Sequence, residues 1–287
     1  IASTWALCCF DVPAMSIRVE NVSFEYTSIN GKVLALDNVS FTVPTSSFYV
    51  ITGESGSGKS TLLRLLNGLR TPSEGKIYLD GEDINSPSFP RASLPFRVGL
   101  VFQYPESQLF AETVIEDVAF GPMNKGIGKK EALEASKKAL LSVGIGEEKW
   151  NSSPFSLSGG EKRRVALAGV MAMDPEVLVL DEIAAGLDGW SHQEVFLLLE
   201  KERKKGKTII LVSHSADDTA EYGERVLVLS KGKVVEEGET RKVFMNPRVP
   251  KCQAERIAEE LRGRGMDLPF PILTLQELSQ EIERNRG

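Results

Sequence analysis

The sequence predicts an α/β fold in which a mixed β-sheet is flanked by helices. Three observations support this prediction. The chain opens with segments of nearly alternating apolar residues, and later apolar segments at 48–52, 177–180 and 208–213 indicate buried strands. The first of these is followed by a glycine-rich loop and then by a helical run. The 287 residues, of which 41% are apolar, are enough to bury a full hydrophobic core.

The composition narrows the possible functions. The formal net charge of -6, from 34 basic and 40 acidic residues, argues against general nucleic-acid binding. No run of about 18 apolar residues occurs, so we expect any membrane role to depend on a partner protein. Cys8, Cys9 and Cys252 cannot form a disulfide framework, which fits a reducing cytosol. Because His192 and His214 lie in no zinc-ligand pattern, a divalent cation is expected on oxygen ligands.

A leader is expected to precede the first strands. Residues 1–14 lack the basic segment of a secretory signal, and we expect them to be non-native or disordered, with Met15 as the native start. From Ser16 onward, apolar residues recur with a period near two, which predicts two antiparallel strands joined around Asn30-Gly31. The fold is therefore expected to begin with an antiparallel β subdomain.

A phosphate-binding loop is expected at residues 53–61. The loop follows the strand at 48–52, precedes a helical run and has the spacing G-x-x-x-x-G-K-S. Its glycines let consecutive backbone N–H groups converge on phosphate oxygens, and the helix N-terminus adds partial positive charge. Lys59 can reach the β- and γ-phosphates, and Ser60 can coordinate Mg²⁺. The simpler interpretation, a glycine-rich turn before a helix, is disfavoured by the Lys-Ser pair in register.

A second anion site is expected at residues 157–161, where another helix starts. Ser158 caps this helix, and Gly159 and Gly160 expose backbone N–H donors. A capping box between Ser158 and Glu161 is a structural explanation of the same residues, and both interpretations can hold together. Two anion-binding helix starts in one chain require an explanation.

Two acidic residues follow the apolar segment 177–180. Carboxylates at the carboxyl end of a buried strand lie where open α/β sheets bind ligands. Because consecutive strand residues point to opposite sides, Asp181 and Glu182 are expected to have different roles. We expect Asp181 to hold Mg²⁺ through a water molecule, together with Ser60, and Glu182 to orient or deprotonate an attacking water. An acidic strand end without a function is the alternative, which the presence of the glycine loop disfavours.

These motifs resemble, over residues 16–246, the nucleotide-binding subunits of ATP-binding cassette (ABC) transporters. The resemblance implies a P-loop NTPase (RecA-like) mixed sheet core with an antiparallel β subdomain, an inserted helical subdomain and a C-terminal helical extension. It also implies that residues 53–61 are the Walker A loop, that residues 157–161 are the ABC signature, and that Asp181 and Glu182 end the Walker B strand. The residues that it implies as ATP contacts are Tyr26, Gly53, Ser55, Gly56, Gly58, Lys59, Ser60, Thr61, Ser158, Gly159, Gly160 and Asp188.

The resemblance assigns further roles around the γ-phosphate. Gln103 is implied to be the Q-loop glutamine, which touches Mg²⁺ and the attacking water and faces the membrane partner. His214 is implied to be the switch histidine that contacts the γ-phosphate, and Glu182 the catalytic carboxylate. Residues 185–188 correspond to the D-loop, and Tyr26 to the aromatic residue that stacks on adenine. Structural interpretations stay open: His214 as a core histidine, Gln103 as a loop amide and Tyr26 as core packing.

The superfamily resemblance explains the two anion sites, because in this superfamily two chains associate head to tail. The signature helix of one chain covers the γ-phosphate held by the Walker A loop of the other, so hydrolysis requires a homodimer or a heterodimer. ATP closes the pair, Glu182 directs water at the γ-phosphate, and phosphate release reopens the interface. Integral membrane transporter subunits clamped to the pair are then driven between two shapes. This arrangement implies a peripheral location on the cytoplasmic face of the cell membrane.

A narrower resemblance indicates one branch of the superfamily. Residues 101–122, with Gln-Leu-Phe followed by Glu-Asp-Val-Ala-Phe-Gly-Pro, are similar to the ATPases of energy-coupling-factor importers of vitamins and of cobalt or nickel. Residues 247–287, with a first helical pattern and a second helix at 275–284, are similar to the C-terminal extension of that group. Such extensions help the two ATPases to pair. A solvated helical hairpin that only adds stability is the alternative.

The chain departs from the superfamily pattern in four places. Ile183-Ala184 follows the catalytic Glu where Pro-Thr is usual, and Gly189-Trp190 follows the D-loop Asp where Pro is common. Glu161 ends the signature where Gln is common, and Ser215 follows the switch histidine where Asp is frequent. No proposed chemical group is lost. The D-loop geometry and the coupling of the two sites are the features that the resemblance determines least, and we expect slow or partner-dependent hydrolysis.

The expected ATPase domain covers residues 15–246, with a helical subdomain over about 98–166 that includes an amphipathic helix at 129–143. The alternatives are another class of ABC transporter, or a soluble ABC ATPase of DNA repair or translation. The interval between the Walker A loop and the signature holds no sustained heptads, and the chain has one cassette instead of two. A small-molecule kinase does not explain residues 157–161. The sequence therefore favours a transporter motor, without identifying its cargo.

Overall fold

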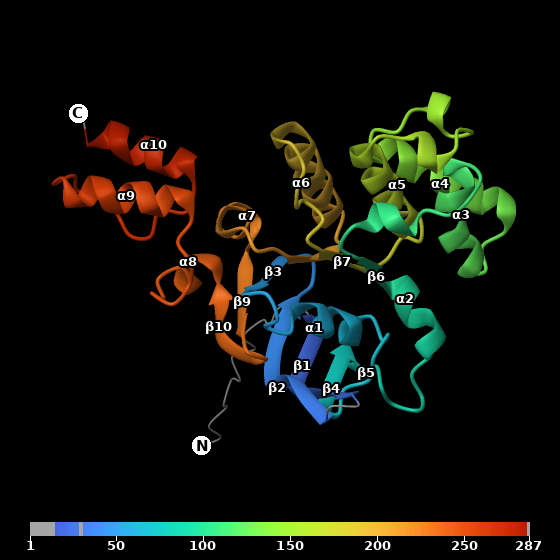
Figure 1. Ribbon diagram of the computed structural model, residues 1–287, viewed down its shortest axis with the longest axis horizontal. Coiled ribbons are helices and arrows are strands. Elements are labelled where there is room, and N and C mark those ends of the chain that lie inside the picture. The colour runs from blue at the N-terminus through green and yellow to red at the C-terminus, as the bar shows by residue number, and fades with distance from the viewer. Residues whose placement is uncertain (1–14, 29–30, 286–287) are drawn as a thin grey trace, which may run out of the picture.

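The computed structural model describes residues 15–28 and 31–285, so the leader expected at residues 1–14 and Asn30 of the expected turn lie outside it. The described chain forms two β-sheets with helices packed on and between them (Figure 1). The α/β class that the sequence predicts is confirmed.

The central sheet has six strands in the order β10-β9-β3-β8-β7-β6. Neighbouring strands are parallel except β10 and β9, which are antiparallel. The strands are β3 (Phe48–Gly53), β6 (Val98–Val101), β7 (Val177–Asp181), β8 (Thr208–Val212), β9 (Arg225–Ser230) and β10 (Lys233–Glu239). Alternate residues enter two separate cores, Val50 and Leu180 one of them and Ile51 and Val179 the other. Because side chains alternate along a strand, these cores lie on opposite faces of the sheet, which explains its continuous apolar segments.

The second sheet is antiparallel and has the strand order β2-β1-β4-β5. Its strands are β1 (Met15–Ser28), β2 (Gly31–Pro44), β4 (Glu74–Leu79) and β5 (Glu82–Asp83). The first two strands pair as the alternating pattern predicts, from Ile17 opposite Val43 to Ser28 opposite Gly31. Helix α1 (Lys59–Leu66) contributes its apolar residues to the core between this sheet and one face of the central sheet. That packing fixes the loop between β3 and α1.

Three helices pack together on the opposite face of the central sheet (Figure 1). They are α3 (Val114–Asn124), α4 (Lys129–Ser142) and α5 (Gly159–Met171). The bounds expected for the helical subdomain, about 98–166, differ from this arrangement at both ends. Val98–Val101 is strand β6, which pairs with β7, and α5 continues to Met171. The apolar segment of β6 is too short to reveal its pairing partner in the sequence.

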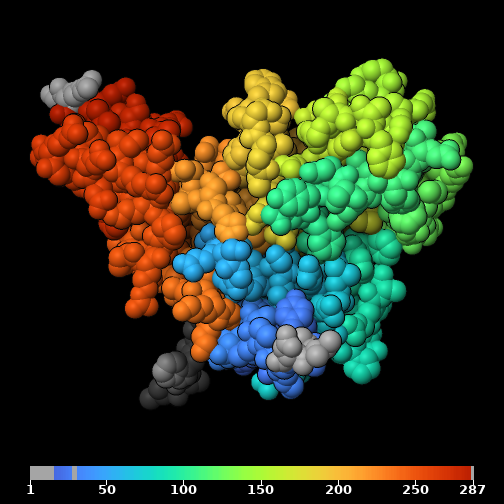
Figure 2. Space-filling model, viewed as in Figure 1, coloured from blue at the N-terminus to red at the C-terminus, as the bar shows by residue number. Residues whose placement is uncertain are grey.

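The remaining helices are α2 (Leu94–Arg97), α6 (Gly189–Lys204), α7 (Ala216–Tyr222), α8 (Thr240–Val243), α9 (Gln253–Gly263) and α10 (Leu275–Arg284). The hairpin of α9 and α10 has its own core, in which Ala258 and Leu278 are buried and which Ala220 of α7 joins. Figure 2 shows this C-terminal segment as a lobe on one side of α6, with helices α3 to α5 on the other side. None of the helices within 15–285 combines the length and the apolar character that crossing a bilayer demands.

Candidate functional site

The glycine loop connects β3 to α1, as the sequence predicts. Gly53 ends the strand with φ 146°, and Gly58 precedes the helix with φ 106°. A Cβ atom at Gly53 would lie 2.0 Å from the carbonyl oxygen of Leu229, so only glycine fits there. Gly58 is the N-cap of α1 and supplies no side-chain cap. The first N–H groups of this helix are therefore available to an anion.

Lys59 lies inside this loop. Its Nζ donates hydrogen bonds to the carbonyl oxygens of Gly53 and Glu54, both at 2.9 Å. Burial lowers the pKa of Lys59, and the carboxylates of Glu182 and Asp181 oppose that shift. The ammonium group is thus held by the loop's own carbonyls, at the point where the loop can receive phosphate.

Asp181 is the last residue of β7 and is buried beside α1. Burial raises the pKa of Asp181, and a hydrogen bond with the side chain of Ser60 lowers it. The hydroxyl of Ser60 and the carboxylate of Asp181 therefore meet at one point, next to the glycine loop. Hydroxyl and carboxylate oxygens are the ligands that Mg²⁺ prefers, so these two residues fit the predicted cation.

The carboxylate of Glu182 contacts the other two residues that the sequence predicts as catalytic. Gln103 Nε2 donates to Glu182 Oε2 at 2.7 Å, and His214 Nε2 lies 2.6 Å from Glu182 Oε1. The three residues follow β6, β7 and β8, whose carboxyl ends lie side by side because β7 pairs in parallel with both neighbours. The sequence placed Glu182 and His214 at strand ends and left Gln103 in a loop, and the structure brings all three together at the Glu182 carboxylate.

The side chains of Asp181 and Glu182 point in different directions, but not because the two residues alternate along a strand, as the sequence predicts. Glu182 lies beyond β7 with φ 51°, in the left-handed region, and its N–H donates to the carbonyl oxygen of Val212 at 3.1 Å. The chain turns at this residue instead of continuing as a strand. Strand alternation is therefore the wrong explanation, and the turn after Asp181 gives the two carboxylates their separate surroundings.

Tyr26 lies beside the glycine loop. Its hydroxyl is 3.1 Å from Thr61 Oγ1, and its ring packs edge-to-face on Phe24 with centroids 4.9 Å apart. These contacts agree both with core packing and with a place next to a bound nucleotide. Adenine stacking by Tyr26 stays a prediction.

The second helix start is capped by its own residues. Ser158 Oγ accepts from the N–H of Glu161 at 3.4 Å, and the Glu161 carboxylate accepts from the N–H and Oγ of Ser158 at 2.9 and 2.8 Å. The predicted capping box is confirmed. The Lys149 ammonium, followed by the bonds from Ser158, lowers the pKa of Glu161 to about 2. Residues of α5 and of α1 enter cores on opposite faces of the sheet, so the start at Ser158 is separate from the phosphate loop of its own chain.

Asp188 is the N-cap of α6. Its carboxylate accepts from the N–H groups of Ser191 and Trp190 at 2.9 and 3.1 Å, and from Ser191 Oγ at 2.9 Å. The bonds from Ser191 lower the pKa of Asp188. Capping explains this residue structurally, and its contact with ATP stays a prediction.

Several residues around the site are not among those that the sequence predicts. A cavity of about 470 Å³ adjoins Gly53 and His214, and Arg248 and Pro250, which lead to α9, line its other side. Arg163 of α5 hydrogen-bonds to the loop that follows Glu182. Neither contact has a signal in the sequence, because both join segments that are far apart along the chain.

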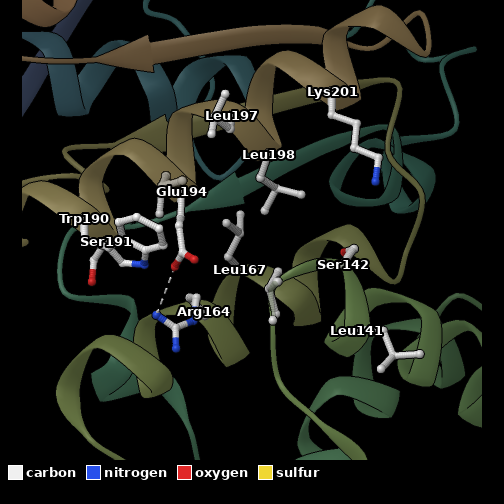
Figure 3. Close-up of a pocket in the computed structure, with 13 residues that line it drawn as sticks. Leu141, Ser142, Arg164, Leu167, Trp190, Ser191, Glu194, Leu197, Leu198 and Lys201 are labelled. Carbon is white, nitrogen blue, oxygen red and sulfur yellow. Dashed lines mark ion pairs between the residues drawn. The ribbon is translucent and has the colours of Figure 1, made fainter.

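A crevice of about 570 Å³ lies between α4, α5 and α6, and Figure 3 shows Arg164 and Glu194 facing each other across it. Its lining residues Trp190 and Leu197 have largely exposed side chains. The residues predicted to hold phosphate or to catalyse are absent from its described lining. We therefore assign the candidate site to the strand ends around Glu182.

Comparisons with known proteins identify the family of this chain. A family model described as ABC transporter matches residues 36–185. The energy-coupling factor transporter ATP-binding protein EcfA2 of Caldanaerobacter subterraneus subsp. tengcongensis is 44% identical over 278 residues, which cover 94% of this chain and 97% of that protein. The EcfA2 protein of Streptococcus pyogenes serotype M3 is 42% identical over 282 residues, covering 94% and 99%.

Solved structures show the same fold. The cbiO1 protein of Clostridium perfringens, described as part of the ABC transporter complex cbiONQ, has 34% identity and a TM-score of 0.73, covering 88% of this chain and 98% of its own. A dimeric post-hydrolysis structure of the ATP-binding cassette MJ0796, bound to ADP and Pi, has 29% identity and a TM-score of 0.70, covering 78% and 99%. The chain therefore belongs to the ABC transporter family, whose activity is the hydrolysis of ATP.

Proposed function

We propose that this chain is the ATP-hydrolysing motor subunit of an energy-coupling-factor importer. In this proposal it binds at the cytoplasmic face of the membrane and drives uptake of a vitamin or a transition-metal ion. The observation that carries the ATPase part is the meeting of Gln103, Glu182 and His214 beside the glycine loop. The importer class is supported by EcfA2 relatives, whose similarity extends over 94% of the chain.

The side chains have separate tasks in the proposed reaction. Lys59 exchanges its bonds to the Gly53 and Glu54 carbonyls for bonds to the β- and γ-phosphates. Ser60 and Asp181 would hold Mg²⁺, which would neutralise charge on the phosphate oxygens. Glu182 orients the attacking water and accepts its proton. Gln103 and His214 hold both oxygens of that carboxylate and so fix its direction.

The second anion site supports a head-to-tail pair of chains. The capped start of α5 and the open start of α1 belong to cores on opposite faces of the central sheet. One chain therefore cannot bring both helix starts to the same phosphate without a large rearrangement. In the proposed dimer the start at Ser158 faces the γ-phosphate bound by the partner chain. Such pairing explains why the chain has a signature helix start that does not contribute to its own phosphate site.

The test is to isolate the protein from native membranes and to measure both its companions and its ATPase activity. We expect multi-spanning membrane proteins, a second ABC ATPase, and ATP-dependent uptake of a vitamin or of cobalt or nickel after reconstitution in vesicles. Companions that include ribosomes or DNA overturn the transport proposal. A reconstituted complex that exports its substrate, or that imports neither kind of cargo, contradicts the importer class while leaving the ATPase assignment intact.

A further inference from the structure

One guanidinium group connects three segments of the candidate site. Arg163 Nη1 donates to the carbonyl oxygens of Ala185 and Ile183, at 2.6 and 3.3 Å. Its Nε and Nη2 each lie 3.4 Å from an oxygen of the Glu106 carboxylate. The side chain of Arg163 is only 12% exposed, so these contacts are largely shielded from water.

The three segments are the ones that carry the predicted catalytic and signature residues. Arg163 lies in α5, in the turn after the start at Ser158. Ile183 and Ala185 follow directly on Glu182 and lead to the α6 cap. Glu106 belongs to the short 3-10 helix η2 (Pro105–Gln108), which comes just after Gln103. Arg163 therefore connects the start of α5 with the segments that follow Glu182 and Gln103.

The loop between Glu182 and Asp188 makes few hydrogen bonds to other elements, while Ile183 is buried in the core on that face of the sheet and Ala184 and Leu187 pack against this core. The N–H of Glu182 is bound by Val212 at one end, and Asp188 caps α6 at the other. Between these ends the loop makes local turns, with Ala185 N–H donating to the Glu182 carbonyl at 3.1 Å. Within the described part of the chain, the hydrogen bonds that the middle of this loop accepts from another element both come from Arg163. Its position is therefore sensitive to that side chain.

The local sequence makes this dependence stronger. Ile183 and Ala184 follow Glu182, and neither of them is proline. Proline fixes φ and restricts the residue before it, whereas Ile and Ala leave the backbone free to sample more conformations. Burial anchors the side chain of Ile183, so what a group outside the loop can still fix is the direction of the loop's backbone carbonyls. Arg163 supplies two donors to these carbonyls on one rigid, planar group.

We propose that Arg163 is a positioning residue that makes the placement of Glu182 and Asp188 depend on the position of helix α5. This proposal rests on the proposed function, in which the start of α5 meets the γ-phosphate bound by the partner chain. When α5 moves toward that phosphate, the guanidinium moves with it and carries the carbonyls of Ile183 and Ala185. Binding at the signature of a chain thereby adjusts the hydrolytic loop of that same chain. Arg163 links one nucleotide site of the dimer to the other.

The test compares Arg163→Gln and Arg163→Lys with the unmodified protein in its complex. For Arg163→Gln we expect kcat to fall about tenfold, because a displacement of about 1 Å can cost more than that, while KM for ATP changes less than about twofold. Hydrogen exchange at residues 183–188 should become faster, with exchange in β7 and β8 unchanged. Arg163→Lys keeps the positive charge but lacks the forked guanidinium group. Its kcat and its exchange rate should lie between those of Arg163→Gln and of the unmodified protein.

Arg97→Gln is the matched control. Arg97 also forms a forked pair, with Nε and Nη2 2.9 and 2.8 Å from the two oxygens of Glu176. It lies at the amino ends of β6 and β7, the sheet edge opposite to the site, so this variant should keep the ATP turnover of the unmodified chain. An Arg163→Gln protein whose kcat and whose hydrogen exchange at residues 183–188 both match those of the unmodified chain overturns the proposal.

Failure of this proposal is distinguishable from failure of the proposed function. An unmodified complex that hydrolyses no ATP overturns the function, whatever the variants do. If the unmodified complex is active and Arg163→Gln loses folding stability as well as activity, the kinetics of Arg163→Lys distinguish a positioning role from a purely structural one. A folded Arg163→Lys protein with lower kcat, unchanged KM and faster exchange at residues 183–188 supports the proposal, and one with unmodified kinetics overturns it.

Discussion

The two helix starts that the sequence predicts as anion sites are built in opposite ways. Helix α1 begins after Gly58, which offers no side chain, so its first N–H groups have no cap. Helix α5 begins after Ser158, and a capping box with Glu161 binds its N–H groups from within the chain. The first start lies next to a buried lysine and two carboxylates, and the second has an ion pair between Lys149 and Glu161.

This difference shows how one motif type serves two purposes. A helix start without a cap is less stable when no ligand is bound, because its first N–H groups have no hydrogen-bond acceptor within the chain. It binds phosphate strongly for the same reason. A capped start keeps its shape without a ligand and can be presented to a second molecule. The structure therefore supports α1 as the site that holds the nucleotide and α5 as a rigid surface that approaches it.

The largest expected effect concerns turnover. Glu182→Gln should lower the rate of ATP hydrolysis by about 1000-fold, because the carboxylate that accepts the proton from water is lost. Binding of ATP should persist, so the pair of chains stays closed with α5 seated on the partner's nucleotide. Phosphate release and gel filtration with ATP measure both effects. Glu176→Gln, before the same strand, is the control, and a Glu182→Gln protein that hydrolyses at the unmodified rate would falsify the role of Glu182.

Affinity at the open helix start depends on Lys59. Lys59→Ala should weaken ATP binding by about 100-fold, because charge-assisted bonds to the phosphates are lost. Calorimetric titration with ATP measures this change. Lys207→Ala is the matched control, since Lys207 Nζ donates to the carbonyl oxygen of Pro175 at 2.9 Å, at the amino end of β8. Equal losses in the two variants would mean that the effect comes from stability and not from the phosphate site.

Ser158→Ala tests the capped helix start. We expect a loss of about 1 kcal/mol in the free energy of unfolding, because the N-cap bond to Glu161 disappears. Turnover should fall about tenfold, while a single chain at high dilution binds ATP as before. Urea unfolding and ATP titration at low protein concentration measure these quantities. Weaker ATP binding by the dilute chain would place Ser158 in the nucleotide site of its own chain, contrary to the separate cores.

The smallest effect is the pH dependence of the Glu161 contribution. The pKa of Glu161 in the folded chain, about 2, lies below its ordinary value, so the ionised group stabilises the fold above the unfolded pKa. That contribution is lost as the pH falls toward the folded value. The difference in unfolding free energy between the unmodified chain and Glu161→Gln should be largest at neutral pH and shrink below about pH 4. A difference that is independent of pH excludes the ion pair with Lys149 as its source.

Much of the site could be predicted from short motifs. The loop at residues 53–61, the capping box at Ser158 and the strand end at Asp181 depend on local spacing, and the structure has each in place. The antiparallel pairing of β1 with β2 also follows from alternation along the chain. These features need only neighbouring residues, since backbone geometry and side-chain type act over a few positions.

Other features depend on contacts between distant segments. The sequence could not show that β6 belongs to the central sheet, because its pairing with β7 joins residues about 80 positions apart. The turn at Glu182, its bonds with Gln103 and His214, and the reach of Arg163 to Ile183 and Ala185 are set by how parallel strands and α5 pack.

The sequence by itself determined which chemical groups this protein has and the order in which they occur, because motifs of this kind are local. Only the tertiary structure decided which of those groups meet. Parallel pairing brings the ends of β6, β7 and β8 together, and the sheet separates α1 from α5 by placing them in different cores. How deeply a side chain is buried and which way it points depend on packing between segments, and no single segment of the sequence specifies that packing.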